Sequence, residues 1–190
     1  MYNIFLKFHV SYPLLSMYNK LMIRGDLFME DLFNEIERGL DAGVYHLSLG
    51  MALCIPDICA ALQSDDGKAS GRKYKEWYNR YVGDKFSMSA DDCYYFRCSF
   101  LHQGSTQHEK SKYNRIIFVE PNSNFFFHNN VINDALNIDV AQFCRGLTDS
   151  AKKWLEEVKE EENFIRNHSN SFKRYSEGLS PYIVGIPVYS

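Results

Sequence analysis

Residues 89–105, SADDCYYFRCSFLHQGS, carry the signals of one complete helix. Ser89 is a residue type that caps helix N-termini, and the two aspartates that follow it lie in the first turn, where acids interact favourably with the helix dipole. Gly104 suits the left-handed conformation that ends many helices. The sequence therefore predicts a helix between Ser89 and Gly104. Its apolar side is expected to consist of Tyr95, Phe96, Phe100 and Leu101.

Helical patterns also precede this stretch. Residues 29–40 place apolar side chains on one face and acids on the other, which is typical of an amphipathic helix. Residues 45–62, YHLSLGMALCIPDICAAL, are apolar almost all round, so we expect a central buried helix that Pro56 kinks or restarts. A third helix is expected over residues 71–82, opened by Ser70 and closed by a glycine.

The chain after residue 105 combines strand signals with one long helix. Residues 114–120 and 125–128 are rich in β-branched and aromatic side chains and flank a Pro-Asn-Ser-Asn turn, which predicts a small β-hairpin over about 114–128. Asp139 then caps a helix that is expected to run from Val140 to about Glu161. The predicted fold is mainly α, a bundle of four to five helices with a small inserted hairpin.

The length of 190 residues predicts a single domain with a sizeable core. We place the helical domain at residues 29–162. Residues 1–28 are expected to form an arm or extension; they lack a clean signal peptide and are too broken by polar residues to cross a bilayer. Residues 163–190 are punctuated by glycine and proline and are expected to form an extended tail packed on the domain. We therefore expect a cytoplasmic protein without a membrane partner.

The composition limits the function classes. The chain is 45% hydrophobic and 24% charged, which is ordinary for a soluble globular protein, and its net charge of −3 excludes a global basic field that would recruit nucleic acid. Its 13 tyrosines and 14 phenylalanines predict large buried contacts, including an oligomer interface. The five cysteines form no C-x-x-C pair and no zinc spacing is present, so we expect free thiols in a reducing cytosol, no metal and no cofactor.

Arg97 and His102 carry the strongest chemical signal. Arginine offers a permanent charge and a planar fork of donors that suits phosphate, and histidine exchanges a proton near neutrality. Residues five apart on a helix are rotated by about 140° and separated by about 7.5 Å of rise, so the two side chains do not share one narrow stripe. Convergence needs either unwinding near Gly104 or a second copy of the motif across a two-fold axis, which predicts a homodimer.

The segment from Phe96 to Ser105 resembles the HEPN superfamily (higher eukaryotes and prokaryotes nucleotide-binding domain), in proteins of bacterial and mobile-element origin. Its motif is an arginine followed a few residues later by a histidine, late in a helix of a bundle. The helical order agrees over about residues 29–159. The resemblance implies a metal-independent ribonuclease that works as a dimer, in toxin or antiphage defence systems, with a cognate antitoxin as a further partner.

This resemblance assigns catalysis to Arg97 and His102, and RNA binding to these two residues and Gln103. Active members often carry a polar residue directly after the arginine, where this chain has Cys98. Two other readings therefore stay open. One is a catalytically silent HEPN-like module that binds RNA, a nucleotide or a protein; the other is a structural helical protein in which Arg97 pairs with an aspartate of its own helix and His102 caps the helix end.

The predicted third helix carries a second candidate for nucleic-acid binding. Basic residues that alternate with aromatic ones can bind RNA by charge and stacking, but a solvated basic face over a packed aromatic face has the same pattern. The basic residues are Arg72, Lys73, Lys75 and Arg80, and the aromatic residues are Tyr74, Trp77, Tyr78 and Tyr81.

Overall fold

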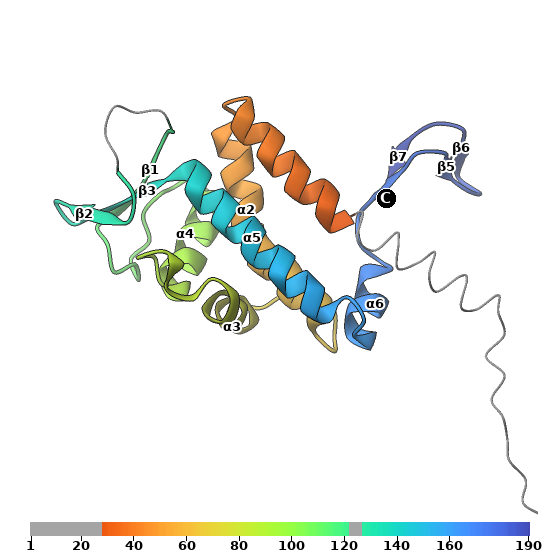
Figure 1. Ribbon diagram of the computed structural model, residues 1–190, viewed down its shortest axis with the longest axis horizontal. Coiled ribbons are helices and arrows are strands. Elements are labelled where there is room, and N and C mark those ends of the chain that lie inside the picture. Colours follow the sequence, from red (N-terminus) through yellow and green to blue (C-terminus); the bar gives the residue numbers. More distant parts are fainter. Residues whose placement is uncertain (1–27, 122–126) are drawn as a thin grey trace, which may run out of the picture.

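A computed structural model describes residues 28–121 and 127–190 of the chain. The arm expected at residues 1–28 therefore lies outside the described residues except for its last position. Six α-helices dominate this part of the chain, and three small sheets accompany them, so the mainly α prediction is confirmed (Figure 1). The elements in order are a helix over 28–41, α2 (Tyr45–Gln63), α3 (Gly71–Tyr81), the single turn η1 (Gly83–Lys85), α4 (Ala90–Gln103), β1 (Arg115–Val119), β2 (Asn130–Ile132), β3 (Ala135–Asp139), α5 (Val140–Val158), α6 (Glu162–His168), β4 (Arg174–Tyr175), β5 (Gly178–Leu179), β6 (Ile183–Val184) and β7 (Val188–Tyr189).

Helix α2 is the centre of the bundle and contacts α3, α4, α5 and α6. It runs as one element through Pro56, so the expected restart does not occur. Proline removes one helical hydrogen bond, and burial of the helix among its neighbours compensates for that local cost. Among the described residues α2 is the one helix long and apolar enough to cross a membrane, and more than half of its apolar window is buried inside the bundle, as in the core helix of a soluble protein.

The predicted helix ends are confirmed because they depend on local chemistry. The side chain of Ser89 accepts a hydrogen bond from the Asp92 backbone N–H, and Asp139 accepts one from Gln142 in the same way. Gly104 closes α4 with a φ of +63°. Helix α5 ends at Val158, three residues before the expected end.

The predicted hairpin is wrong in its pairing. Strand β1 forms as expected, but it pairs in parallel with β3, which also pairs antiparallel with β2 in the order β1-β3-β2. The second expected strand lies partly outside the described residues, and its last two, 127–128, are not in a strand. The hairpin is instead formed by β2 and β3 around Asn133 and Asp134, whose φ angles of +49° and +61° suit a tight two-residue turn.

The C-terminal tail also differs from the expectation. Residues 162–168 form α6, which packs on α2. Residues 174–189 then fold back on themselves, because β4 pairs with β7 and β5 pairs with β6. Figure 1 shows this C-terminal ribbon projecting from the end of the bundle rather than lying along it. Most of its side chains are exposed.

Candidate functional site

Arg97 lies in the middle of α4 and turns toward the bundle. Its guanidinium forms an ion pair with the carboxylate of Asp57 on α2. The pair is mostly removed from solvent, since 21% of the Arg97 side chain and 12% of the Asp57 side chain are exposed. The site therefore begins with a largely buried Arg–Asp pair that joins two helices of the bundle.

Few polar groups surround this ion pair. Cys98 Sγ lies 3.9 Å from Arg97 Nη1, and Arg97 Nε is buried without an acceptor among the described residues. Burial raises the pKa of the Asp57 carboxyl, and the charge of Arg97 opposes this shift. Burial likewise raises the pKa of the Cys54 thiol, which lies in the field of both charges. Two thiols and one ion pair thus share a site of low polarity.

His102 lies in different surroundings, although it is on the same helix. It is exposed in the last turn of α4, and Gln103 beside it is exposed as well. The helix closes there through hydrogen bonds from the N–H of Gly104 to the Phe100 carbonyl and from Ser105 to the Ser99 carbonyl. The structure thus directs Arg97 inward and leaves His102 in solvent, in agreement with their angular separation on an ideal helix.

The expected pairing of Arg97 with an aspartate of its own helix is wrong. Asp91 pairs with Lys75 on α3, and Asp92 accepts hydrogen bonds from the backbone of Lys112 and the side chain of Ser111. Both carboxylates interact with residues outside α4. Arg97 therefore pairs with the carboxylate of Asp57, which faces it from α2.

Sequence reasoning missed Asp57 as a site residue. The signal that could have found it is a carboxylate inside an otherwise apolar helix, because a buried charge needs a partner. The sequence contained that signal in the segment Pro56-Asp57-Ile58, but it did not say which of the chain's cations would be the partner.

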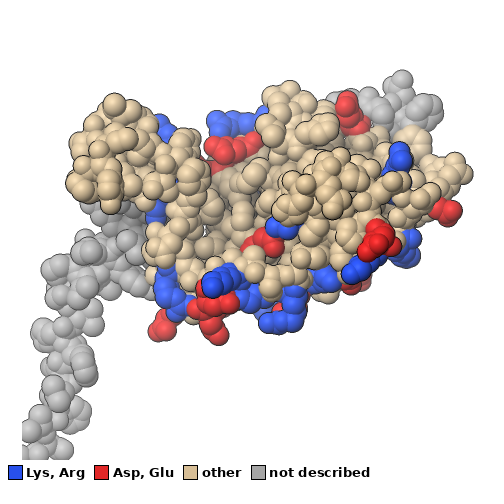
Figure 2. Space-filling model, turned by 180° about the vertical axis from the view of Figure 1, so that it is seen from behind, with Lys and Arg blue, Asp and Glu red and all other residues tan. Residues whose placement is uncertain are grey.

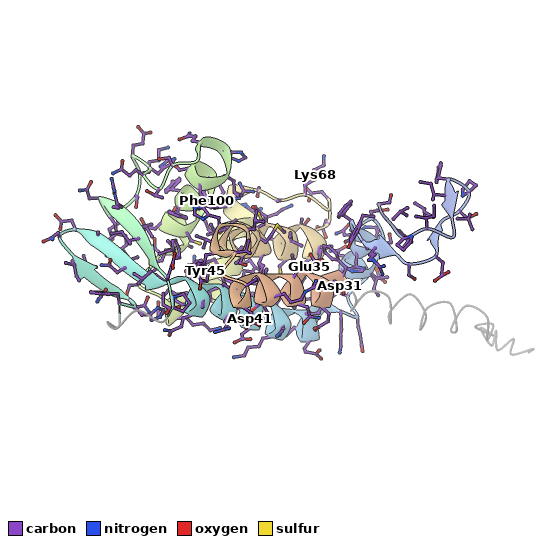
Figure 3. All side chains as sticks on the ribbon, turned by 90° about the horizontal axis from the view of Figure 1, so that it is seen from above. Asp31, Glu35, Asp41, Tyr45, Lys68 and Phe100 are labelled. Atoms are coloured by element: carbon purple, nitrogen blue, oxygen red, sulfur yellow. The ribbon has the colours of Figure 1, made fainter. Side chains whose placement is uncertain are left out.

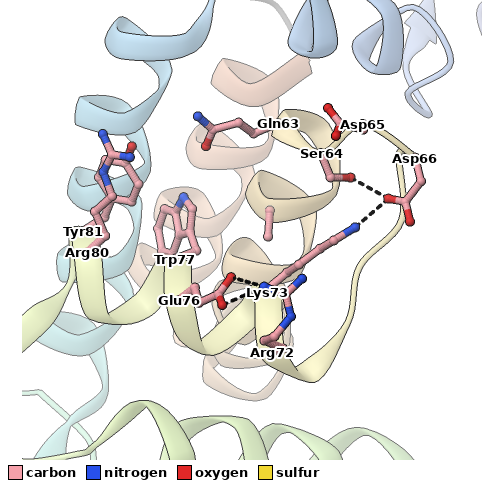
Figure 4. A pocket seen from close by; sticks show the side chains of 11 residues that line it. Gln63, Ser64, Asp65, Asp66, Arg72, Lys73, Glu76, Trp77, Arg80 and Tyr81 are labelled. Carbon is pink, nitrogen blue, oxygen red and sulfur yellow. Dashed lines mark hydrogen bonds and ion pairs between the residues drawn. The ribbon is translucent and has the colours of Figure 1, made fainter.

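The basic residues of α3 do not form a free cationic surface. Arg72 pairs with Glu76, Lys73 with Asp66, Lys75 with Asp91 and Arg80 with Glu157. Three of these cations border a cleft of about 550 Å³ next to α2, where Figure 4 shows the pairs of Arg72 and Lys73. On the face drawn in Figure 2, basic and acidic atoms lie side by side.

The aromatic residues of α3 explain the rest of its pattern. Tyr74, Trp77 and Tyr78 are buried in the core, and Tyr81 is partly buried. Tyr78 also donates a hydrogen bond to the Met88 carbonyl. The interpretation of α3 as a solvated basic face over a packed aromatic face is therefore confirmed.

All five cysteines are free thiols, and three of them are buried. Burial raises the pKa of Cys93 and of Cys144 to about 12, so neither is a thiolate at neutral pH. Within residues 28–121 and 127–190, no group of three or more His, Cys, Asp or Glu side chains is arranged to hold a metal ion.

Comparison of the chain with protein-family models, with curated proteins and with solved structures finds no match.

Proposed function

We propose that this protein is a cytoplasmic, HEPN-like endoribonuclease that cleaves RNA without a metal, in a toxin or antiphage defence system. The observation that carries the proposal is that α4 holds one anchored arginine and one exposed histidine. Arg97 is anchored by a carboxylate of the neighbouring helix, and His102 is exposed at the end of the same helix. A fixed cation and an accessible histidine are the two groups that this chemistry requires.

The reaction needs two proton transfers and stabilisation of one charge. His102 accepts the proton of a ribose 2′-hydroxyl, whose oxygen attacks the adjacent phosphorus. The bond from phosphorus to the 5′-oxygen breaks, the leaving oxygen takes a proton from the protonated imidazole of His102, and a 2′,3′-cyclic phosphate remains. Arg97 stabilises the negative charge on the phosphoryl oxygens. Asp57 acts as a positioning residue, because it holds the guanidinium at the α2–α4 contact.

A second copy of the chain completes this site in the proposal. Arg97 and His102 of one α4 face different surroundings, so one helix does not present both groups to a single phosphate. Two copies related by a two-fold axis place two motifs along one RNA-binding cleft, to which Gln103 contributes an amide.

The alternative function is a catalytically silent module that binds RNA, a nucleotide or a protein partner such as an antitoxin. The charge balance of Arg97 favours it. The Asp57 carboxylate already neutralises the guanidinium, and Cys98 supplies no strong hydrogen-bond acceptor or donor beside it. A purely structural role remains the third reading, in which Arg97 serves only the contact between α2 and α4.

The deciding experiment is cleavage of a labelled single-stranded RNA by the purified protein in excess EDTA, followed between about pH 5 and pH 9. We expect a cyclic-phosphate product, and no cleavage of DNA of the same sequence. His102→Ala should lower the rate by about 10²–10⁴-fold without unfolding the protein, because His102 is exposed. His108→Ala is the matched control, since His108 stacks on Tyr95 outside the motif.

Two further variants separate the readings. Arg97→Lys should recover only part of the activity that Arg97→Ala loses, because lysine lacks the planar fork. Cleavage that persists in His102→Ala would refute the mechanism. Binding of RNA without cleavage by the wild type would select the silent module, and Cys98→Asn would then test whether a polar neighbour of Arg97 restores cleavage.

A further inference from the structure

The C-terminal ribbon and its base expose several large apolar side chains. Tyr182 is 81% exposed and Val184 is 71% exposed. Figure 2 shows the ribbon as a lobe with few charged atoms, on the left of the view. Contiguous apolar patches above a few hundred Å² are rare on monomers and mark interaction surfaces. The exposed apolar residues of the ribbon and its base are Phe172, Tyr182, Ile183, Val184, Ile186 and Tyr189.

Among the residues that the structure describes, the ribbon is held mainly by its own short strand pairs. Each of its two sheets pairs only two residues with two others. An isolated two-stranded ribbon is marginally stable in water, and packing against a further apolar surface is needed to hold it. The bundle of the same chain does not supply this surface, because the ribbon projects beyond its end (Figure 1).

A largely apolar groove lies elsewhere on the chain. It has a volume of about 330 Å³ and lies between the helix over residues 28–41 and the first turns of α2. Leu47 is 72% exposed at its edge, and Met51 beside it is a flexible side chain that adapts to different partners. The lining residues are Leu32, Glu35, Ile36, Gly39, Val44, Leu47, Ser48 and Met51.

The groove runs along the side of the first helix, whereas the ribbon projects from the end of the molecule where that helix begins (Figure 1). Phe28, at the start of the first helix, contacts His168 of α6, next to the ribbon. The groove follows that helix from Leu32, one turn after Phe28, to Gly39. Figure 3 shows Asp41 and Tyr45 past the far end of the groove, away from the ribbon, and Glu35 nearer to the ribbon. In the described part of the chain the ribbon points away from the groove of its own bundle, so a second, antiparallel copy is the occupant that this projection favours.

We propose that this protein forms a two-fold antiparallel dimer in which the C-terminal ribbon of each copy docks in the apolar groove of the other. Three of the exposed residues of the ribbon and its base are aromatic, and burying an aromatic side chain removes roughly 150–250 Å² from solvent. With the aliphatic residues, the ribbon supplies on the order of the 800 Å² that each partner buries in a standard interface. The reciprocal contact closes after two copies, so no apolar end remains open. This inference does not rest on the proposed ribonuclease activity.

The test uses one charged substitution in each surface of the full chain. Leu47→Glu changes the groove and Val184→Arg changes the ribbon; both positions are exposed, so circular dichroism should show an unchanged helix content. Light scattering should find a dimer for the wild type at micromolar concentration. Each variant should weaken dimerisation on the order of a hundredfold, because an unpaired charge would enter an apolar contact. Val131→Arg on β2, where Val131 is also exposed, is the matched control and should remain dimeric.

Mixing the two variants gives the sharper result. In a mixed dimer one contact is native, and in the other the introduced arginine faces the introduced glutamate. Dimers should therefore return when Leu47→Glu and Val184→Arg are combined. A monomeric wild type, species that grow without limit with concentration, or a failure of the mixture to dimerise would each overturn the proposal. Loss of dimers in Val184→Arg but not in Leu47→Glu would also overturn it, in favour of ribbon-to-ribbon pairing.

Discussion

Trp154 in the bundle and Tyr182 in the C-terminal ribbon are both large aromatic residues, yet one is fully buried and the other is 81% exposed. Trp154 lies on α5, whose apolar residues recur at helical spacing and form one face toward α2 and α3. The strands of the ribbon pair with each other and leave their apolar side chains uncovered. Aromatic content therefore predicts burial where another element of the same chain faces the aromatic residue, and Tyr182 shows that it does not do so elsewhere.

The largest effect expected from this comparison is that of Trp154→Ala. The substitution leaves a cavity between α5, α3 and α6, where Trp154 packs against Trp77 and Phe164. It also removes the hydrogen bond that the indole donates to Gln63 Oε1 at 3.0 Å. The free energy of unfolding should fall by about 3–5 kcal/mol, which urea unfolding followed by circular dichroism measures. Trp154→Phe keeps most of the packing and should lose clearly less; equal losses in the two variants would contradict a packing origin.

An intermediate effect is expected for Arg97→Ala, because it leaves the Asp57 carboxylate without its counter-ion at a largely buried position. The loss of stability should be about 2–3 kcal/mol at pH 7. The pKa of Asp57 is already raised by burial, and removal of Arg97 raises it further. A raised carboxyl pKa means that the folded state binds the proton more tightly, so this loss should grow as the pH rises from about 4 to 7.

The control for this prediction is the double variant Arg97→Ala with Asp57→Asn. An amide at residue 57 carries no charge, so the double variant should be more stable than Arg97→Ala alone at pH 7, and its deficit should not depend on the ionisation of residue 57. A deficit in Arg97→Ala that is the same at pH 4 and pH 7 would show that the guanidinium acts through packing of its stem rather than through charge.

The parts of the fold that the sequence predicted are those set by neighbouring residues. Ser89, Asp139 and Gly104 act on their own helix ends, so their roles could be inferred from a few positions. The pairing of β1 with β3 could not, because a parallel pair joins segments separated by a connection that the sequence does not place. The tight turn at Asn133 could have been predicted from its own residues. The Pro-Asn-Ser-Asn segment contains more turn-forming residues and led the prediction to place the hairpin there instead.

The candidate site shows the same difference between what local sequence predicts and what tertiary packing decides. The position of Arg97 and His102 on one helix, and their divergence around it, followed from helix geometry. The choice of Asp57 as the partner of Arg97 did not, because it depends on the packing of α4 against α2 and on the capture of Asp91 and Asp92 by other elements. Local rules place a functional residue on an element, and tertiary packing decides which charge it meets.

The smallest effect is expected for Tyr182→Ser in the ribbon, and it tests the comparison from the other side. Tyr182 is mostly exposed, and its backbone N–H donates a hydrogen bond to the Leu179 carbonyl, which serine preserves. At a dilution where the chain is monomeric, the free energy of unfolding of the bundle should change by no more than about 0.5 kcal/mol. At concentrations where dimers form, the same variant should lose the part of the wild-type stability that increases with protein concentration. A loss of several kcal/mol in the dilute sample, comparable to that of Trp154→Ala, would mean that the ribbon packs on its own bundle in solution. That result would contradict both the contrast between Tyr182 and Trp154 and the docking of each ribbon in the groove of the other copy.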